Sequence, residues 1–202
     1  MALTAPNVLT LFRVATAPLL VYLLLHTGPV AAALAAAVFL LATLSDYFDG
    51  YLARSYGTAT TLGKFLDPLA DKLIVAAALI MLAGASAPQR VPAWLVVVIV
   101  WRELMVTGLR AVAAGEGVVI GASDLGKYKM VLQAIAIQGL LVRYTYFGVN
   151  FFAAGMFVLW IATAVSLWSG VDYYVRTIAV LAAKEVVRPA TEARFDKLRS
   201  AG

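Results

Sequence analysis

Long apolar runs, separated by short polar breaks, most limit what this chain can fold into. Hydrophobic residues make up 63% of its 202 residues and charged residues 13%, whereas the apolar share of a soluble domain is roughly 45–50%. A membrane-crossing helix needs about 20 apolar residues, so the chain is long enough for about six spans with short connections. The sequence therefore predicts an all-α integral membrane protein, a bundle of six transmembrane helices.

The expected spans lie between the polar, glycine and proline residues that interrupt the apolar runs. Their approximate limits are 7–25, 30–52, 62–84, 93–114, 126–141 and 149–174, the last of which can extend further. Residues 183–202 are rich in Lys and Arg and are expected to form a basic cytoplasmic tail. The chain has no cysteine, which excludes disulfides and thiolate metal sites.

Four aspartates lie between two of the most apolar runs, where negative charge without a partner is unfavourable. They are Asp46, Asp49, Asp67 and Asp71. The members of each pair are three or four positions apart, so on helices each pair lies on one face. If the connection between the helices reverses the chain, all four carboxylates meet. Hard oxygen ligands of this kind favour Mg²⁺ or Mn²⁺, and four can hold two ions roughly 3.5–4 Å apart for phosphoryl displacement.

The spacing of this stretch resembles the signature of a known enzyme family. Residues 46–71 read D-x2-D-G-x2-A-R-x8-G-x3-D-x3-D, which is similar to the signature of the CDP-alcohol phosphatidyltransferases, integral membrane enzymes of phospholipid synthesis. The resemblance implies transfer of the phosphatidyl group of CDP-diacylglycerol to an alcohol, with release of CMP and with two divalent ions. In this interpretation Asp46, Asp49 and Asp67 are the principal metal ligands. Asp71 is both a metal ligand and the catalytic general base.

The same resemblance predicts the residues that hold the lipid donor. The amino-terminal run P-N-V-L-T-L-F-R is similar to the family segment that helps to hold the cytidine nucleotide. Small residues in the signature leave room for the nucleotide, and polar ones contact the donor. The expected CDP-diacylglycerol-binding residues are Asn7, Thr10, Gly50, Ala53, Arg54 and Thr60.

Four cations are candidates for binding the phosphate of the second substrate. R-E-L-M-V-T-G-L-R at 102–110 and G-K-Y-K at 126–129 resemble the blocks of the family branch whose acceptor is sn-glycerol 3-phosphate. The expected acceptor-phosphate residues are Arg102, Arg110, Lys127 and Lys129. Two alternatives stay open: inositol phosphate or another alcohol as acceptor, and a partnership of Arg102 with a glutamate that only locks helices together.

The cations also indicate the orientation of the chain. Threading six spans places all of the 16 Lys and Arg residues except Arg90 and Arg143 on the side of the two termini. The positive-inside rule then predicts a multi-pass protein of the cell (inner or plasma) membrane, with both termini and an active-site cavity at the cytoplasmic side. The net charge of +5 favours anionic membrane lipids and phosphate substrates as partners over nucleic acid.

The expected organisation is a single six-helix transmembrane catalytic domain over 1–182, followed by the tail over 183–202. Members of the family are commonly homodimers, and the later Ala- and Gly-containing spans could supply the contact. Acidic and basic residues inside a membrane are also typical of cation or proton transporters. Against a transporter, the aspartates cluster at one end of two expected helices and form no relay across the membrane.

Overall fold

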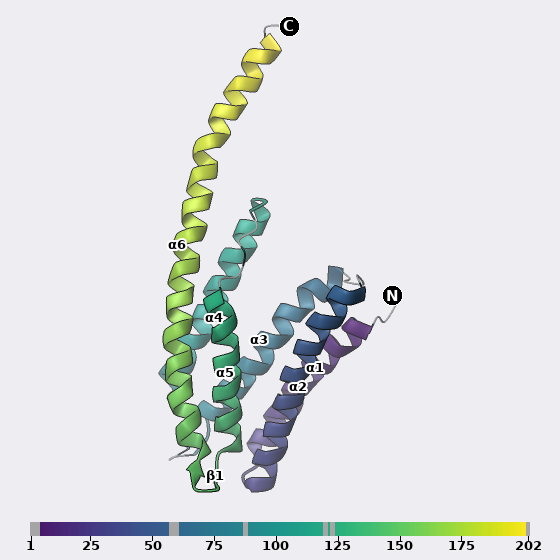
Figure 1. Cartoon of the computed structure of the whole chain (residues 1–202), viewed down its shortest axis with the longest axis vertical. Helices are drawn as coiled ribbons and strands as arrows, with labels where there is room; N and C mark the ends of the chain where they lie inside the picture. Colours follow the sequence, from purple (N-terminus) through teal and green to yellow (C-terminus); the bar gives the residue numbers. More distant parts are fainter. Residues whose placement is uncertain (1–4, 57–60, 87–88, 119–120, 122–123, 201–202) are drawn as a thin grey trace.

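The computed structural model describes residues 5–56, 61–86, 89–118, 121 and 124–200. Within these ranges, the side chains of 5–11, 46–56, 61–71, 124 and 184–200 lie outside the description. The described chain forms six helices: α1 (Ala5–Leu25), α2 (Pro29–Tyr56), α3 (Thr61–Ala83), α4 (Ala93–Gly115), α5 (Asp124–Val142) and α6 (Phe151–Ser200). A short hairpin of β1 (Thr145–Tyr146) and β2 (Val149–Asn150) precedes α6. The all-α prediction is confirmed, and each expected span corresponds to one helix (Figure 1).

The helices pack in two connected groups. α1 packs against both α2 and α3, while α5 lies along α6 and α4 packs against α6 and α3 (Figure 1). The groups are joined by the contact of α2 with α5 and by the contacts of α3 with α4 and α5. The centre of the bundle is apolar and includes the fully buried side chains of Leu20, Phe39, Leu79, Leu95, Ile137 and Leu159.

The end of α2 and the start of α3 lie at the same end of the molecule. Only residues 57–60 separate the two helices along the chain. Beyond this connection α2 and α3 diverge and make few contacts with each other (Figure 1). The backbone therefore reverses where the sequence requires it to, with Asp46 and Asp49 in the last turns of α2 and Asp67 and Asp71 in the first turns of α3.

The connection between α5 and α6 is a tight hairpin that the span pattern does not predict. Phe147 and Gly148 form its turn with positive φ angles of 53° and 78°, the combination that two-residue hairpin loops require. The backbone N–H of Ala153 donates to Asn150 Oδ1 at 3.0 Å and caps the start of α6. The sixth helix therefore begins at Phe151, two residues after the expected start at 149.

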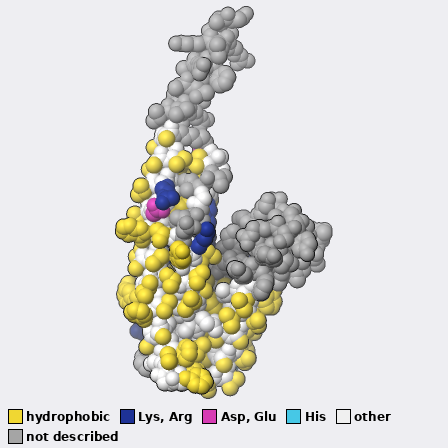
Figure 2. Space-filling model, in the orientation of Figure 1, with side chains coloured by type: hydrophobic (Ala, Val, Ile, Leu, Met, Phe, Trp, Pro, Cys, Tyr) yellow, Lys and Arg dark blue, Asp and Glu magenta, His cyan; other side chains and the backbone are white. Residues whose placement is uncertain are grey.

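Apolar side chains cover most of the described surface in the view of Figure 2. Large hydrophobic residues are exposed on several helices, including Trp168 of α6 at 71% and Leu104 of α4 at 65%. Exposed apolar surface of this extent marks contact with lipid or with another apolar partner. Within the described residues, one stretch, Phe151–Ala183 of α6, is long and apolar enough to cross a bilayer, and most of it is not buried in the protein.

The last helix continues past the expected end of the membrane domain. α6 runs without interruption from Phe151 to Ser200, so the expected boundary at residue 183 lies inside one helix. In Figure 1 its carboxyl-terminal part extends away from the other helices. The cytoplasmic location of residues 183–202 stays a prediction.

Candidate functional site

The predicted metal and donor residues that the structure describes lie on the first three helices. The described backbone places Asn7 and Thr10 in α1, Asp46, Asp49, Gly50, Ala53 and Arg54 in α2, and Asp67 and Asp71 in α3. Their side chains, and Thr60 as a whole, lie outside the described residues. Their roles stay predictions.

Lys72, the residue after Asp71, connects the aspartate helix to α4. Its Nζ donates to Thr107 Oγ1 at 2.5 Å. The hydroxyl of Thr107 in turn donates to the backbone oxygen of Glu103 at 2.6 Å. These two hydrogen bonds connect the middle of α3 to the centre of α4.

Arg102 is a buried cation held between α4 and α6. Only 6% of the residue is exposed, and its Nε donates to the backbone oxygen of Ser166 at 2.8 Å. Gly170, one turn further along α6, leaves room for the side chain, because a Cβ there would lie 3.1 Å from the Arg102 Nε. A buried arginine inside an apolar bundle is unfavourable unless an anion or several acceptors compensate it.

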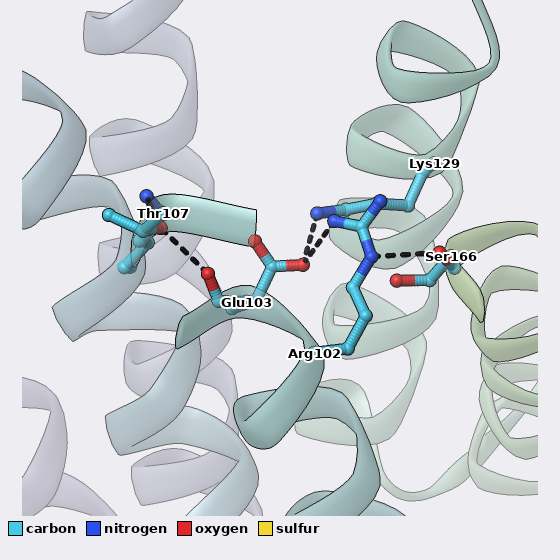
Figure 3. Close-up of polar contacts among 6 residues, drawn as sticks. Arg102, Glu103, Thr107, Lys129 and Ser166 are labelled. Carbon is cyan, nitrogen blue, oxygen red and sulfur yellow. Dashed lines mark hydrogen bonds and ion pairs between the residues drawn. The ribbon is translucent and has the colours of Figure 1, made fainter. Parts of the chain in front are cut away.

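The carboxylate of Glu103 supplies that negative charge, and it also pairs with Lys129 of α5. Arg102 Nη1 donates to Glu103 Oε1 at 3.2 Å, and Lys129 Nζ donates to the same oxygen. Figure 3 shows both cationic side chains directed at this carboxylate. We call Arg102, Glu103 and Lys129 the Glu103 cluster. With two cations and one carboxylate, the cluster carries a net positive charge.

The structure brings two of the four predicted acceptor cations together. Arg102 and Lys129 meet at the Glu103 cluster. Arg110 is exposed, and its guanidinium carbon lies 5.5 Å from the centre of the Tyr173 ring on α6, a cation–π arrangement. Lys127 is exposed near the start of α5. The expected partnership of Arg102 with a glutamate is therefore present, and it includes a second cation.

Buried polar groups lie near the Glu103 cluster, between α4, α5 and α6. Gln133 Nε2 and Ser166 Oγ are buried without a hydrogen-bond partner among the described residues. Both residues border a gap too narrow for a water molecule, together with Ile99, Leu159, Ala162 and Thr163. The hydroxyl of Tyr173, beside Arg110, is also buried and unpartnered within the described part of the chain. Buried polar groups of this kind are rare in native proteins. They give the space between α4, α5 and α6 a polar character.

The sequence signature did not identify Glu103, Thr107 and Lys72 as members of the site. A signal was available for Glu103, because it is an acidic residue next to an arginine inside an apolar run. No local pattern marks Thr107 or Lys72. Their hydrogen bond joins residues 35 positions apart and exists only in the folded chain.

The four aspartates have the chemistry of a metal site, but their side chains are not among those that the structure describes. Among the described side chains, no group of three or more His, Cys, Asp or Glu could hold an ion. The four aspartates of α2 and α3 are outside that set. They offer carboxylate oxygens alone, the ligands that Mg²⁺ and Mn²⁺ prefer.

A helical bundle with an apolar surface, four carboxylates on two joined helices and a buried cation cluster has the features of a membrane enzyme that acts on phosphate groups. Comparison with known proteins identifies the family. The CDP-alcohol phosphatidyltransferase pattern matches residues 3–168, and the chain belongs to this family. It is therefore an enzyme of the CDP-alcohol phosphatidyltransferase class.

Several relatives share most of the chain. The CDP-diacylglycerol–glycerol-3-phosphate 3-phosphatidyltransferase of Bacillus subtilis (strain 168) is 41% identical over 181 residues, which cover 84% of this chain and 92% of that protein. A probable phosphatidylglycerophosphate synthase of Mycobacterium tuberculosis (strain H37Rv) is 40% identical over 175 residues, covering 85% and 80%. A cardiolipin synthase (CMP-forming) of Oryza sativa subsp. japonica is 35% identical over 185 residues, covering 85% of this chain and 56% of that protein.

Proposed function

We propose that this enzyme transfers the phosphatidyl group of CDP-diacylglycerol to sn-glycerol 3-phosphate, giving phosphatidylglycerophosphate and CMP. The observation that carries this proposal is the similarity to a relative named for this reaction. The two proteins are 41% identical, and the matched residues cover 92% of the relative. Relatives named for the same reaction or for phosphatidylglycerophosphate synthesis recur at 34–40% identity. The complete aspartate signature at 46–71 supports the same chemistry.

Asp46, Asp49, Asp67 and Asp71 would hold two Mg²⁺ or Mn²⁺ ions, which supply charge neutralisation for the diphosphate of the donor. Asn7, Thr10, Arg54 and Thr60 would contact the polar groups of CDP-diacylglycerol. Gly50 and Ala53 would leave space for its nucleotide. The two acyl chains would stay among the lipids that surround the apolar outer surface.

The transfer itself is a direct displacement at phosphorus. Asp71 accepts the proton of the acceptor hydroxyl. The oxygen of that hydroxyl forms a bond to the β-phosphorus, and the bond from this phosphorus to the bridging oxygen breaks. The electron pair of that bond leaves with CMP. The following residue, Lys72, connects this part of α3 to α4, the helix that carries Arg102 and Glu103.

The acceptor carries a phosphate of its own and needs a second anion site. The Glu103 cluster offers one, because Arg102 and Lys129 bring two buried cations to one carboxylate. Arginine binds phosphate oxygens as a planar fork and lysine as a point charge. Arg110 and Lys127 are exposed and would attract the anion to this site.

The membrane arrangement that fits this chemistry is multi-pass, with the aspartates and both termini in the cytoplasm. Gln89 Nε2 donates to the backbone oxygen of Arg143 at 3.2 Å. The α3–α4 connection, which contains Arg90, therefore lies beside the end of α5. Both cations that the sequence assigns to the far side thus occupy one end of the bundle. This is the charge asymmetry that the positive-inside rule describes.

A homodimer remains part of the proposal. Gly139 and Gly155, two glycines of the later spans, contact each other between α5 and α6 within one chain and so do not serve a dimer contact. The exposed apolar face of α4, which includes Trp94, Val97 and Trp101, is a better candidate.

The decisive experiment is an acceptor panel. Purified protein in lipid–detergent micelles receives CDP-diacylglycerol and one of several acceptors: sn-glycerol 3-phosphate, glycerol, inositol phosphate or phosphatidylglycerol. We expect phosphatidylglycerophosphate and equimolar CMP with the first acceptor. Faster CMP release with inositol phosphate, or the formation of cardiolipin, would assign a different acceptor. Ion flux in liposomes without CMP release would favour a transporter.

A further inference from the structure

We propose that Glu103 is a positioning residue for the acceptor phosphate. Its carboxylate holds the Lys129 ammonium beside the Arg102 guanidinium, so that both cations are in place when the phosphate arrives. The inference rests on the proposed function, because it takes a phosphorylated alcohol as the second substrate. Glu103 itself acts through Lys129 and Arg102.

The shared carboxylate oxygen is the first observation. Lys129 Nζ and Arg102 Nη1 both donate to Oε1 of Glu103, so the two positive groups lie close together. Like charges at this separation repel each other strongly where water is scarce. Each cation is 6% exposed. Without the carboxylate, the flexible side chain of Lys129 would move away from Arg102.

The charge balance among the described side chains is the second observation. There, two cations and one anion leave the Glu103 cluster with a surplus of one positive charge. A buried ion pair that only joins helices is complete with one cation for each carboxylate, and a further buried cation is unfavourable. A phosphate group supplies the additional negative charge, and its oxygens match the guanidinium fork and the ammonium.

The third observation is that contacts with α6 hold the side chain of Arg102 in place. Its Nε is fixed by the backbone oxygen of Ser166 at 2.8 Å, and Gly170 lies against its aliphatic part. Arg102 is therefore held from α6 whether or not Glu103 is charged. Lys129 has no comparable anchor among the described contacts apart from Glu103. Glu103 thus determines the position of Lys129 more than that of Arg102.

Glu103 also connects this phosphate site to the helix of the proposed base. Its backbone oxygen accepts the Thr107 hydroxyl, which accepts Lys72 Nζ. Lys72 follows Asp71 directly on α3. The helix of the proposed base and the backbone of Glu103 are therefore joined by two hydrogen bonds. This arrangement suits an acceptor that is bound at its phosphate and deprotonated at its hydroxyl.

Steady-state kinetics of the full chain in lipid–detergent micelles tests the proposal. CDP-diacylglycerol and sn-glycerol 3-phosphate are varied separately for the wild type, Glu103→Gln, Lys129→Met and the double variant. Glu103→Gln is expected to raise the KM for sn-glycerol 3-phosphate about tenfold, as the loss of one charged hydrogen bond does. The KM for CDP-diacylglycerol is expected to stay unchanged.

The matched control is Asp172→Asn. It removes a carboxylate from α6 that pairs with Arg176 at 2.9 Å on the exposed side of the helix. Exposed pairs contribute little, so both KM values are expected to stay at the wild-type level. A rise in the acceptor KM for this variant equal to that of Glu103→Gln would overturn the proposal.

The double variant separates positioning from an independent contribution. If Glu103 acts by holding Lys129, the double variant has the acceptor KM of Lys129→Met alone. If the effects of the two single variants on the acceptor KM multiply in the double variant, the proposal is overturned. Equal rises in both KM values after Glu103→Gln would also overturn it, because they indicate that Glu103 only holds the helices together. If Glu103→Gln does not fold, Glu103→Asp takes its place. A raised acceptor KM with an unchanged donor KM supports the proposal, and an unchanged acceptor KM overturns it.

The activity of the wild type distinguishes a failure of the proposed function from a failure of the positioning role of Glu103. If the wild type releases no CMP with sn-glycerol 3-phosphate, the proposed function fails. If the wild type is active and the Glu103 variants keep a normal acceptor KM, only the positioning role fails.

Discussion

Gly155 of α6 lies so close to α5 beside Gly139 that a Cβ on Gly155 would come within 2.7 Å of the backbone nitrogen of Leu140. Gly155→Ala is therefore expected to force α5 and α6 apart and to lower the free energy of unfolding by about 1–3 kcal/mol. Thermal unfolding in detergent measures the change.

Gly108→Ala of α4 is the control for this variant. A Cβ at Gly108 meets nothing within 4 Å, and alanine is the better helix former by ~1 kcal/mol. We expect unchanged or slightly higher stability. If Gly155→Ala unfolded at the temperature of Gly108→Ala, the close packing of α5 on α6 would be contradicted.

Gly170→Ala is expected to disturb Arg102 without changing any charge. The new Cβ would lie 3.1 Å from Nε and 3.3 Å from Cγ of Arg102, so the side chain must shift by a few tenths of an ångström. If Arg102 binds the acceptor phosphate, the KM for sn-glycerol 3-phosphate rises about two- to tenfold while the donor KM stays constant. An unchanged acceptor KM would argue against a phosphate contact by Arg102.

Asp71→Asn tests the proposed general base. The amide keeps the size of the side chain but does not accept the hydroxyl proton, so we expect turnover to fall at least about 100-fold. Binding of CDP-diacylglycerol, measured with a labelled donor, is expected to persist. Near-normal turnover would refute the role of Asp71 as base.

Removal of divalent ions tests the metal site. Four carboxylates without ions repel each other and do not neutralise the donor diphosphate. EDTA is therefore expected to abolish CMP release, and Mg²⁺ or Mn²⁺ is expected to restore it. Full activity in excess EDTA would contradict a metal role for Asp46, Asp49, Asp67 and Asp71.

Arg110→Ala tests the exposed cation beside Tyr173. Its guanidinium faces the ring of Tyr173 at 5.5 Å, near the hydroxyl that has no partner among the described residues. We expect the KM for sn-glycerol 3-phosphate to rise more than the KM for the lipid donor, because the lost charge acts on the acceptor anion. Equal changes in both KM values would speak against an acceptor site at Arg110.

Much of the fold was predictable because apolar length is encoded locally. Each apolar run became one helix, and the limits of α3 and α4 agree with the expected spans to within one residue. The hairpin before α6 was missed, because β1 and β2 have two residues each and depend on the turn at Phe147 and Gly148. The sixth span was expected to end at about residue 174 or beyond, and α6 continues to Ser200, since a charged sequence at the end of an apolar helix does not end the helix.

The sequence alone determined the class of chemistry, because the type and spacing of Asp46, Asp49, Asp67 and Asp71 are properties of a continuous stretch. It also identified Arg102 and Lys129 as candidates, because 102–110 and 126–129 resemble two blocks of the family. Only the tertiary structure decided that these two cations share one oxygen of Glu103, and that Lys72 reaches Thr107. Such contacts join helices far apart in the chain, and their partners are chosen by packing, which local sequence does not specify.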